Sequence, residues 1–266
     1  MSAFETTPLY DSIGVGYDTT RRADPYIASR LWYHLGVAEG GLYLDVACGT
    51  GNYTTVLASR GGVLHGIDQS RQMIRSAQQK SSLVNWYQGD VAALPFKDGI
   101  FSGAFITCAI HHFESLLDVF AQVHRVMGSG RFVIFTTTPQ QTRGYWLNEY
   151  FPKAMEKSID QLPALDIVET ALLEAGFRMD DTEPYEVQSD LQDFFLYSGK
   201  HRPEMYLSES VRRGISTFAS LADPLEVETG CSRLRADIES GRINQVMETY
   251  RHGEGDYIFI VAIKEG

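Results

Sequence analysis

The stretch from Leu42 to Tyr53 restricts the folds open to this chain more than any other. It begins as a short apolar run, which predicts a buried strand, and then turns through Gly49 and Gly51 into a helical pattern that reaches Arg60. Glycines let a ligand approach the backbone closely because they carry no Cβ. In open α/β sheets, such a turn receives nucleotide-like ligands at the carboxyl ends of the strands. The stretch therefore predicts an α/β fold with a ligand site at this turn.

The spacing of the glycines indicates which ligand. A dinucleotide fingerprint needs Gly-x-Gly-x-x-Gly, whereas the frame from Ala47 reads Ala-Cys-Gly-Thr-Gly-Asn and places Asn52 at the third glycine position. Together with Asp45, the turn resembles motif I of the class I S-adenosylmethionine (SAM)-dependent methyltransferases, Asp/Glu-x-Gly-x-Gly-x-Gly, and departs from it at Ala47. The resemblance implies that Asp45, Ala47, Gly49 and Gly51 lie at the cofactor SAM, with Ala47 able to push its methionine part slightly outward.

The second predicted strand, Val63–Asp68, ends in an acid 23 residues after Asp45. A carboxylate at this place offers two oxygens to the hydroxyls of a ribose, and the resemblance implies that Asp68 binds the ribose of SAM. The alternative for Asp68 is a helix N-cap. Gln69 starts the following helical pattern and is assigned to the cofactor site, while Met73 packs either on the adenine or in the core.

The third predicted strand, 84–89, is followed by Asp90 and Val91. The resemblance implies that Asp90 holds the adenine amino group and that Val91 lies on the ring. The alternative for Asp90 is an Asx-turn that closes the strand. The fourth strand, 101–109, is implied to face the methionine half of SAM, with Thr107 among the residues of that wall.

Three residues are candidates for a general base or an orienting group: His111, His112 and Tyr17. The histidines follow the fourth strand, and an imidazole titrates near neutral pH, so it can take a proton from a nucleophile. In an extended segment at most one of two adjacent side chains is well aimed. The alternative is that the pair caps the next helix. Tyr17 lies in a Tyr-Asp…Arg segment similar to one that folds over SAM in related enzymes, which also makes Arg21 or Arg22 a candidate.

The alternation of strands and helices predicts an α/β sandwich. The resemblance, closest to the type 11 small-molecule group, implies a Rossmann-like, seven-stranded, mostly parallel sheet whose last strand is antiparallel and lies beside the fifth. About 65 residues separate the sixth strand from the seventh, far more than a typical loop. We therefore expect a core of 1–187 plus 256–266, with an N-terminal helical lid segment at 1–41, and a helical cap at 188–255 that completes the substrate pocket. Further elements are expected as strands at 131–139, 177–187 and 256–264, helices at 114–127, 166–175, 190–198, 208–222 and 224–239, and a lid segment at 140–165.

Composition limits the partners. The formal net charge of −11 over 266 residues argues against a nucleic-acid surface, which would be basic. The three cysteines lack metal-ligand spacing, so no metal is expected. No apolar run approaches a membrane span, and the first residues lack the pattern of a signal peptide, so a cytoplasmic protein without membrane or nucleic-acid partners, monomeric or homodimeric, is expected.

Three functions remain open from the sequence. The first is methyl transfer from SAM to an O, N or C atom of a small molecule, yielding S-adenosylhomocysteine. The second is methylation of a carrier-bound group or a protein. The third is a SAM-binding protein that does not methylate. Because the sulfonium is already a good leaving group, such an enzyme must mainly hold the nucleophile in line with the methyl group and exclude water.

Overall fold

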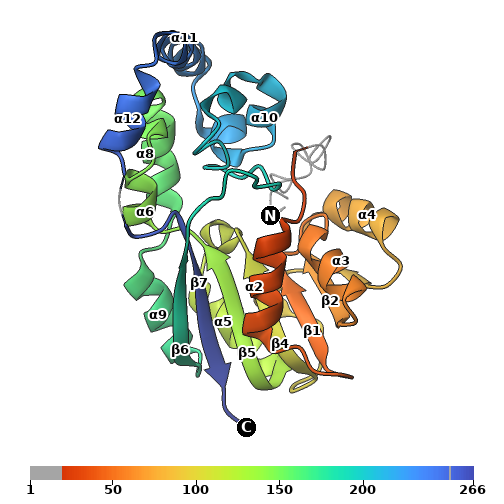
Figure 1. Ribbon diagram of the computed structural model, residues 1–266. Helices are drawn as coiled ribbons and strands as arrows, with labels where there is room; N and C mark the ends of the chain where they lie inside the picture. Colours follow the sequence, from red (N-terminus) through yellow and green to blue (C-terminus); the bar gives the residue numbers. More distant parts are fainter. Residues whose placement is uncertain (1–19, 252) are drawn as a thin grey trace, which may run out of the picture.

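The strands form one mixed sheet in the computed structural model, which describes residues 20–251 and 253–266 (Figure 1). Within these residues the sheet has seven strands in the order β3-β2-β1-β4-β5-β7-β6. Strand β7 runs antiparallel to both β5 and β6, and the other pairings are parallel, so the predicted topology is confirmed. The strands are β1 Leu42–Val46, β2 Val63–Asp68, β3 Asn85–Gln88, β4 Phe101–Thr107, β5 Met127–Thr136, β6 Arg178–Tyr185 and β7 Tyr257–Lys264.

Helices cover both faces of the sheet. Helices α2 and α3 pack on one face, and α5 and α9 pack on the other, each side forming its own apolar core. The central strands are buried on both faces, which explains their nearly continuous apolar sequences. The α-helices are α2 Pro25–Leu35, α3 Asn52–Ser59, α4 Arg71–Lys80, α5 Leu116–Val126, α6 Pro139–Arg143, α7 Leu147–Tyr150, α8 Pro152–Gln161, α9 Leu165–Glu174, α10 Glu209–Arg213, α11 Pro224–Ser240 and α12 Ile243–Thr249. Shorter helical turns are η2 Val91–Ala93, η3 Ile110–His112, η4 Pro203–Leu207 and η5 Thr217–Leu221.

Strand β5 begins four residues earlier than the sequence indicates, at Met127 rather than at Arg131. The glycines at 128 and 130 suggest a helix end, but α5 already stops at Val126. Gly130 has a φ of +147°, and a Cβ there would lie 2.0 Å from the Ser102 carbonyl oxygen. The glycine therefore allows β5 to pass close to β4, where the pairing register shifts.

The helical cap sits at the carboxyl ends of the parallel strands (Figure 1). It contains residues from both sides of β6, because α8, before that strand, packs on η5, and α7 packs on α11, both after it. The expected lid segment 140–165 thus forms helices α6 to α8 and the start of α9. We propose that these helices and residues 188–255 act together as the cap.

The helix expected at 190–198 is wrong, since these residues form turns and irregular structure. Their backbone is held by tertiary contacts instead: the Phe194 N–H donates to the Thr20 carbonyl at 3.0 Å, and the Gln192 N–H donates to the Asp24 carboxylate at 3.2 Å. The expected helix 208–222 is broken into α10 and η5, and α12 was not anticipated.

Candidate active site

A cavity of about 640 Å³ lies at the carboxyl ends of β1, β2 and β4. Its volume is typical of a small-molecule or cofactor site. Nine of the ten residues assigned to the cofactor line it, which supports one common site at this edge of the sheet. They are Asp45, Ala47, Gly49, Asp68, Gln69, Met73, Asp90, Val91 and Thr107.

The tenth residue, Gly51, does not line this cavity. It precedes α3 with a φ of +71°, and a Cβ there would lie 2.1 Å from the Trp86 ring. The expectation that Gly51 faces the ligand therefore needs correction: this glycine is required for its left-handed backbone and for its packing against Trp86. Gly49, by contrast, has a φ of +55° and leaves its backbone open, since a Cβ there would meet no atom within 4 Å.

The backbone of Ala47 is also left-handed, with a φ of +57°. An L-residue there costs roughly 1–2 kcal/mol relative to glycine, while glycine loses roughly 0.4–1 kcal/mol through the greater entropy of the unfolded chain. We expect Ala47→Gly to raise the free energy of unfolding by about 0.5–1 kcal/mol, as measured by urea unfolding. As a control, Ala236→Gly on the exposed face of α11 should lower it by about 1 kcal/mol. If Ala47→Gly were less stable than the wild type, the left-handed backbone at Ala47 would not be strained.

Asp68 joins the turn after β1 to the turn after β2. Its Oδ2 accepts the Gly49 N–H at 2.9 Å, and its Oδ1 accepts the Ser70 N–H at 2.8 Å. The N-cap of α4 is Ser70, whose hydroxyl accepts the Met73 N–H. The alternative that Asp68 is the N-cap is therefore wrong. These bonds hold the carboxylate at the wall of the cavity, where its oxygens are suited to accept hydrogen bonds from a ligand.

Asp90 makes the Asx-turn that the sequence left as an alternative: its Oδ1 accepts the Ala92 N–H at 2.9 Å and starts η2. The turn and a ligand contact are compatible, since Asp90 also lines the cavity. Met73 likewise fits both of its expected places, because it lines the cavity and is at the same time buried in the core, with only 2% of its surface exposed. Val91 lies beside them, half-buried at the cavity wall.

Asp45 is the most buried acid of the cavity. Its Oδ2 accepts the Thr54 hydroxyl, while Oδ1 has no hydrogen-bond partner within the described part of the chain. Burial raises the pKa of Asp45 well above its usual range, the Thr54 hydrogen bond opposes this rise, and the charge of Asp68 adds to it. Asp45 is therefore suited to be a neutral, hydrogen-bonding wall of the cavity.

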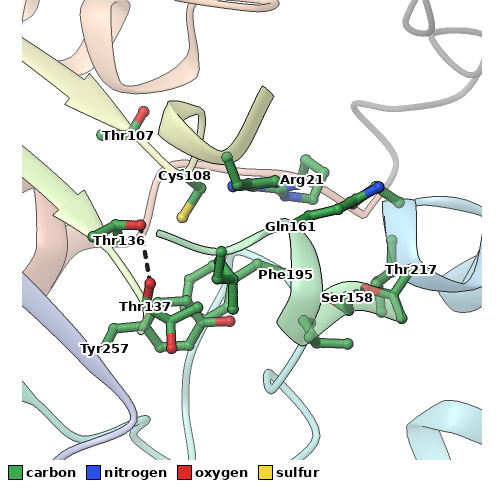
Figure 2. Close-up of a pocket in the computed structure, with 15 residues that line it drawn as sticks. Arg21, Thr107, Cys108, Thr136, Thr137, Ser158, Gln161, Phe195, Thr217 and Tyr257 are labelled. Atoms are coloured by element: carbon green, nitrogen blue, oxygen red, sulfur yellow. Dashed lines mark hydrogen bonds between the residues drawn. The ribbon is translucent and has the colours of Figure 1, made fainter. Parts of the chain in front are cut away.

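A second, smaller cavity of about 90 Å³ lies between the strand ends and the cap. Figure 2 shows Thr107, Cys108 and Thr136 on the strand side and Ser158 and Thr217 on the opposite side. Three residues line both cavities and so mark the place where they meet: Arg21, Thr107 and Cys108. The other residues that line the small cavity are His111, Thr137, Gln161, Leu162, Phe195, Leu196, Ile215, Ser216 and Tyr257.

Arg21 is held at this junction by Asp193, which sequence reasoning missed. The Arg21 guanidinium forms an ion pair with the Asp193 carboxylate, and the Tyr53 hydroxyl donates to Asp193 Oδ2 at 3.0 Å. The Asp193 side chain is only 4% exposed. Three segments therefore meet here: the N-terminal segment, α3 and the cap. Of the two candidate arginines, Arg22 is exposed and lines neither cavity.

His111 and His112 lie on η3, so they do not form the extended segment that was assumed. Their rings are 4.0 Å apart, and each faces a different cavity, His111 the small one and His112 the large one. The helix-capping alternative is wrong, because Ser115 caps α5 by accepting the Asp118 N–H. Tyr17 lies outside the described residues.

Burial keeps the imidazole of His111 neutral. It lowers the pKa of His111 to about 3, with smaller contributions from His112 and from the Arg21 charge. Its Nδ1 is buried and has no hydrogen-bond partner among residues 20–251 and 253–266. Burial also lowers the pKa of His112 to about 4, although this residue is more exposed to solvent than His111.

We expect acid to destabilise the protein through His111. Its folded-state pKa lies below the usual 6.5, so the unfolded chain takes up the proton first. The stability contributed by the neutral ring is therefore present above pH 6.5 and is lost as the pH falls toward 3. Between pH 7 and pH 5, urea unfolding should show that the free energy of unfolding falls by roughly 2 kcal/mol because of this residue. In His111→Gln the loss on acidification should be smaller by about this amount, and an equal loss in both proteins would contradict the assignment.

Cys108 belongs to the wall that both cavities share. Its φ is +51°, a strained value for a residue other than glycine, and burial raises the pKa of its thiol to about 12. A neutral thiol is a poor nucleophile and a poor metal ligand. Within the described residues, no group of three or more His, Cys, Asp or Glu side chains could hold a metal ion. No helix among them is long and apolar enough to cross a membrane.

Comparison with known proteins gives a consistent picture. A family model described as a methyltransferase domain matches residues 44–135. The Bacillus subtilis protein YqeM, described as a methyltransferase, is 31% identical over 134 residues, which cover 48% of this chain and 54% of that protein. The chain thus spans about half the length of this curated relative.

Two solved structures extend the similarity across the cap. One is described as a methyltransferase from an antibiotic biosynthesis pathway of Anabaena variabilis; it is 32% identical, with a TM-score of 0.81, and the match covers 91% of this chain and 98% of that one. The other, the 4+2 cyclase SpnF, is 14% identical with a TM-score of 0.64, covering 98% and 95%, and at this identity it shows the fold alone.

Proposed function

Since the chain belongs to the class I SAM-dependent methyltransferases, we propose that it transfers the methyl group of SAM to a small molecule. The larger cavity would hold SAM, and the smaller cavity would hold the methyl acceptor. The observation that carries this proposal is the junction of the two cavities at Arg21, Thr107 and Cys108. A methyl group can pass directly from one ligand to the other only where two sites meet.

The residues of the larger cavity suit SAM. The Asp68 carboxylate lines the cavity and can accept hydrogen bonds from the ribose hydroxyls, and Asp90 has a second oxygen for the adenine amino group. Met73 and Val91 offer apolar surface for the adenine ring. Asp45 supplies a buried polar wall near the Gly49 turn, where the methionine part would lie. SAM supplies an activated methyl group, so the protein has to orient the acceptor and exclude water.

A small acceptor is favoured over a carrier-bound group or a protein. The acceptor cavity of about 90 Å³ lies between the strand ends and the cap, and a cavity of this volume suits a small acceptor group. The related structure from an antibiotic biosynthesis pathway agrees with a small-molecule acceptor. The similarity to SpnF means that the fold alone does not decide the chemistry, so methyl transfer has to be measured.

Calorimetric titration with SAM and with S-adenosylhomocysteine tests the cofactor site, and release of S-adenosylhomocysteine in the presence of acceptors tests the reaction. We expect both ligands to bind and the release to depend on an acceptor. Absence of binding to folded protein would reject the cofactor assignment. Binding of both ligands without methylation of any acceptor would favour a SAM-binding protein that does not methylate.

A further inference from the structure

The small cavity contains information about the acceptor itself. Its lining residues include one permanently charged side chain, the Arg21 guanidinium, and no aspartate or glutamate. Arg21 is already paired with Asp193, which lines only the larger cavity. The other polar groups around the small cavity are hydroxyls, the Gln161 amide and the His111 ring.

A charged acceptor is poorly matched to these surroundings. A buried ammonium would lie near a guanidinium with no carboxylate of its own, and burying an unpaired charge is costly. A carboxylate would have to compete with Asp193 for Arg21, because no second permanent cation is found among the described residues that line the cavity. A neutral group avoids both costs.

The hydrogen-bonding groups point to a hydroxyl. Ser158 and Thr217 are bonded to each other at 3.0 Å, and the Thr136 hydroxyl donates to the Thr137 carbonyl at 3.3 Å (Figure 2). The buried Nδ1 of His111 has no partner in the described part of the chain. A neutral imidazole carries one donor and one acceptor nitrogen, and a hydroxyl can pair with either.

The volume limits the size of the buried group. A cavity of about 150 Å³ in another protein holds a benzene ring, whereas this one measures about 90 Å³. Because the cavity is open rather than closed, its volume favours a small reacting group, and the rest of the acceptor can extend out of it.

We propose that the methyl acceptor is a neutral hydroxyl on a small aliphatic group, bound in the small cavity and oriented by His111. This inference rests on the proposed methyl transfer. The hydroxyl oxygen forms a bond to the methyl carbon as the bond from that carbon to sulfur breaks, and the breaking bond leaves its electron pair on sulfur. The hydroxyl proton passes to the His111 ring and from there to solvent. An alkylated oxygen that still carries its proton is a far stronger acid than an imidazolium, so a weakly basic ring suffices.

The test uses three matched pools of small acceptors with the same carbon skeletons: alcohols, primary amines and carboxylic acids. The purified full chain is incubated with methyl-labelled SAM, and the methylated products are separated and identified by mass spectrometry. We expect products from the alcohol pool at a rate at least tenfold above those from the other two. Methylation of amines or acids at an equal or higher rate would overturn the proposal.

A carboxylate added to the cavity provides a second test. Gln161, at the end of α8, is exposed and lines the cavity, so Gln161→Glu adds a carboxylate with almost no change of shape. The variant should methylate amines at least tenfold faster than the wild type does, with unchanged affinity for SAM. Gln188→Glu, at an exposed glutamine outside both cavities, is the matched control and should leave the acceptor preference unchanged. No gain for amines in Gln161→Glu would count against a selection by charge.

His111 is tested separately. His111→Phe should raise the KM for alcohols at least tenfold with an unchanged Kd for SAM, and His111→Gln, which keeps a neutral hydrogen-bonding group, should recover part of the loss. Equal KM values for all three proteins would overturn the orienting role.

The wild type separates two kinds of failure. If SAM does not bind to it, or if SAM binds and no pool is methylated, the proposed function is wrong. If amines or acids are methylated instead of alcohols, only the proposed acceptor class is wrong.

Discussion

Asp68→Ala is expected to weaken SAM binding by at least about 100-fold. In the proposed complex Asp68 accepts hydrogen bonds from two ribose hydroxyls, and a hydrogen bond to a charged group contributes roughly 1.5–3 kcal/mol. The substitution also leaves the N–H groups of Gly49 and Ser70 without their carboxylate, so the two turns at the cavity lose a common support. The loss of affinity should exceed that of any single change in the cap.

Calorimetry measures this loss, and urea unfolding separates it from a loss of folding. Asp90→Ala is the comparison, because Asp90 is exposed and its side chain accepts only the Ala92 N–H among the described residues. We expect it to weaken binding less than Asp68→Ala does. An affinity of Asp68→Ala equal to the wild-type value would refute the ribose assignment.

Asp193→Ala is expected to lower both stability and activity. Breaking a buried ion pair by removing one partner costs roughly 3–5 kcal/mol, since the remaining charge loses the carboxylate that compensated it. Arg21 is half-buried rather than fully enclosed, so we expect about 3 kcal/mol. The same guanidinium, without Asp193, would face the sulfonium of SAM across the junction, and repulsion between like charges should weaken SAM binding about tenfold.

Thermal unfolding and calorimetry measure the two effects. The control is Glu209→Ala, which removes a surface partner of Arg213 where the two side chains are 67% and 78% exposed. That change should alter stability by less than about 0.5 kcal/mol. A double variant, Arg21→Met with Asp193→Leu, removes both charges and should recover much of the stability without recovering activity. Wild-type activity in Asp193→Ala would show that the ion pair does not organise the site.

The lining of the larger cavity was largely predictable because it is local in sequence. Asp45, Asp68, Asp90 and Thr107 each lie at or just beyond the end of a strand, and parallel strands bring these ends to one edge of the sheet. Once the strands were recognised, their side chains had to converge. Even so, the role of Gly51 came only from its neighbour, since no local pattern indicates that Trp86 packs against it.

The part of the two cavities that the cap contributes was not predictable in the same way. Asp193, Ser158, Gln161 and Thr217 come from turns and helices of the cap, where no motif marks them. Asp193 lies in a stretch whose composition suggested a helix, but contacts with Thr20 and Asp24 hold its neighbours in turns instead. Tertiary hydrogen bonds decided this segment against its local preference.

The sequence by itself therefore determined the α/β class and the edge of the sheet at which the glycine turn and the acids meet, because strand periodicity and turn residues act over short distances. The topology of the sheet was implied by the family resemblance. Only the tertiary structure decided that Arg21 and Asp193 meet, that His111 faces a different cavity from His112, and that the described lining of the smaller cavity carries no carboxylate. These features depend on residues that are far apart in the chain, and their positions follow from how the cap packs over the strand ends.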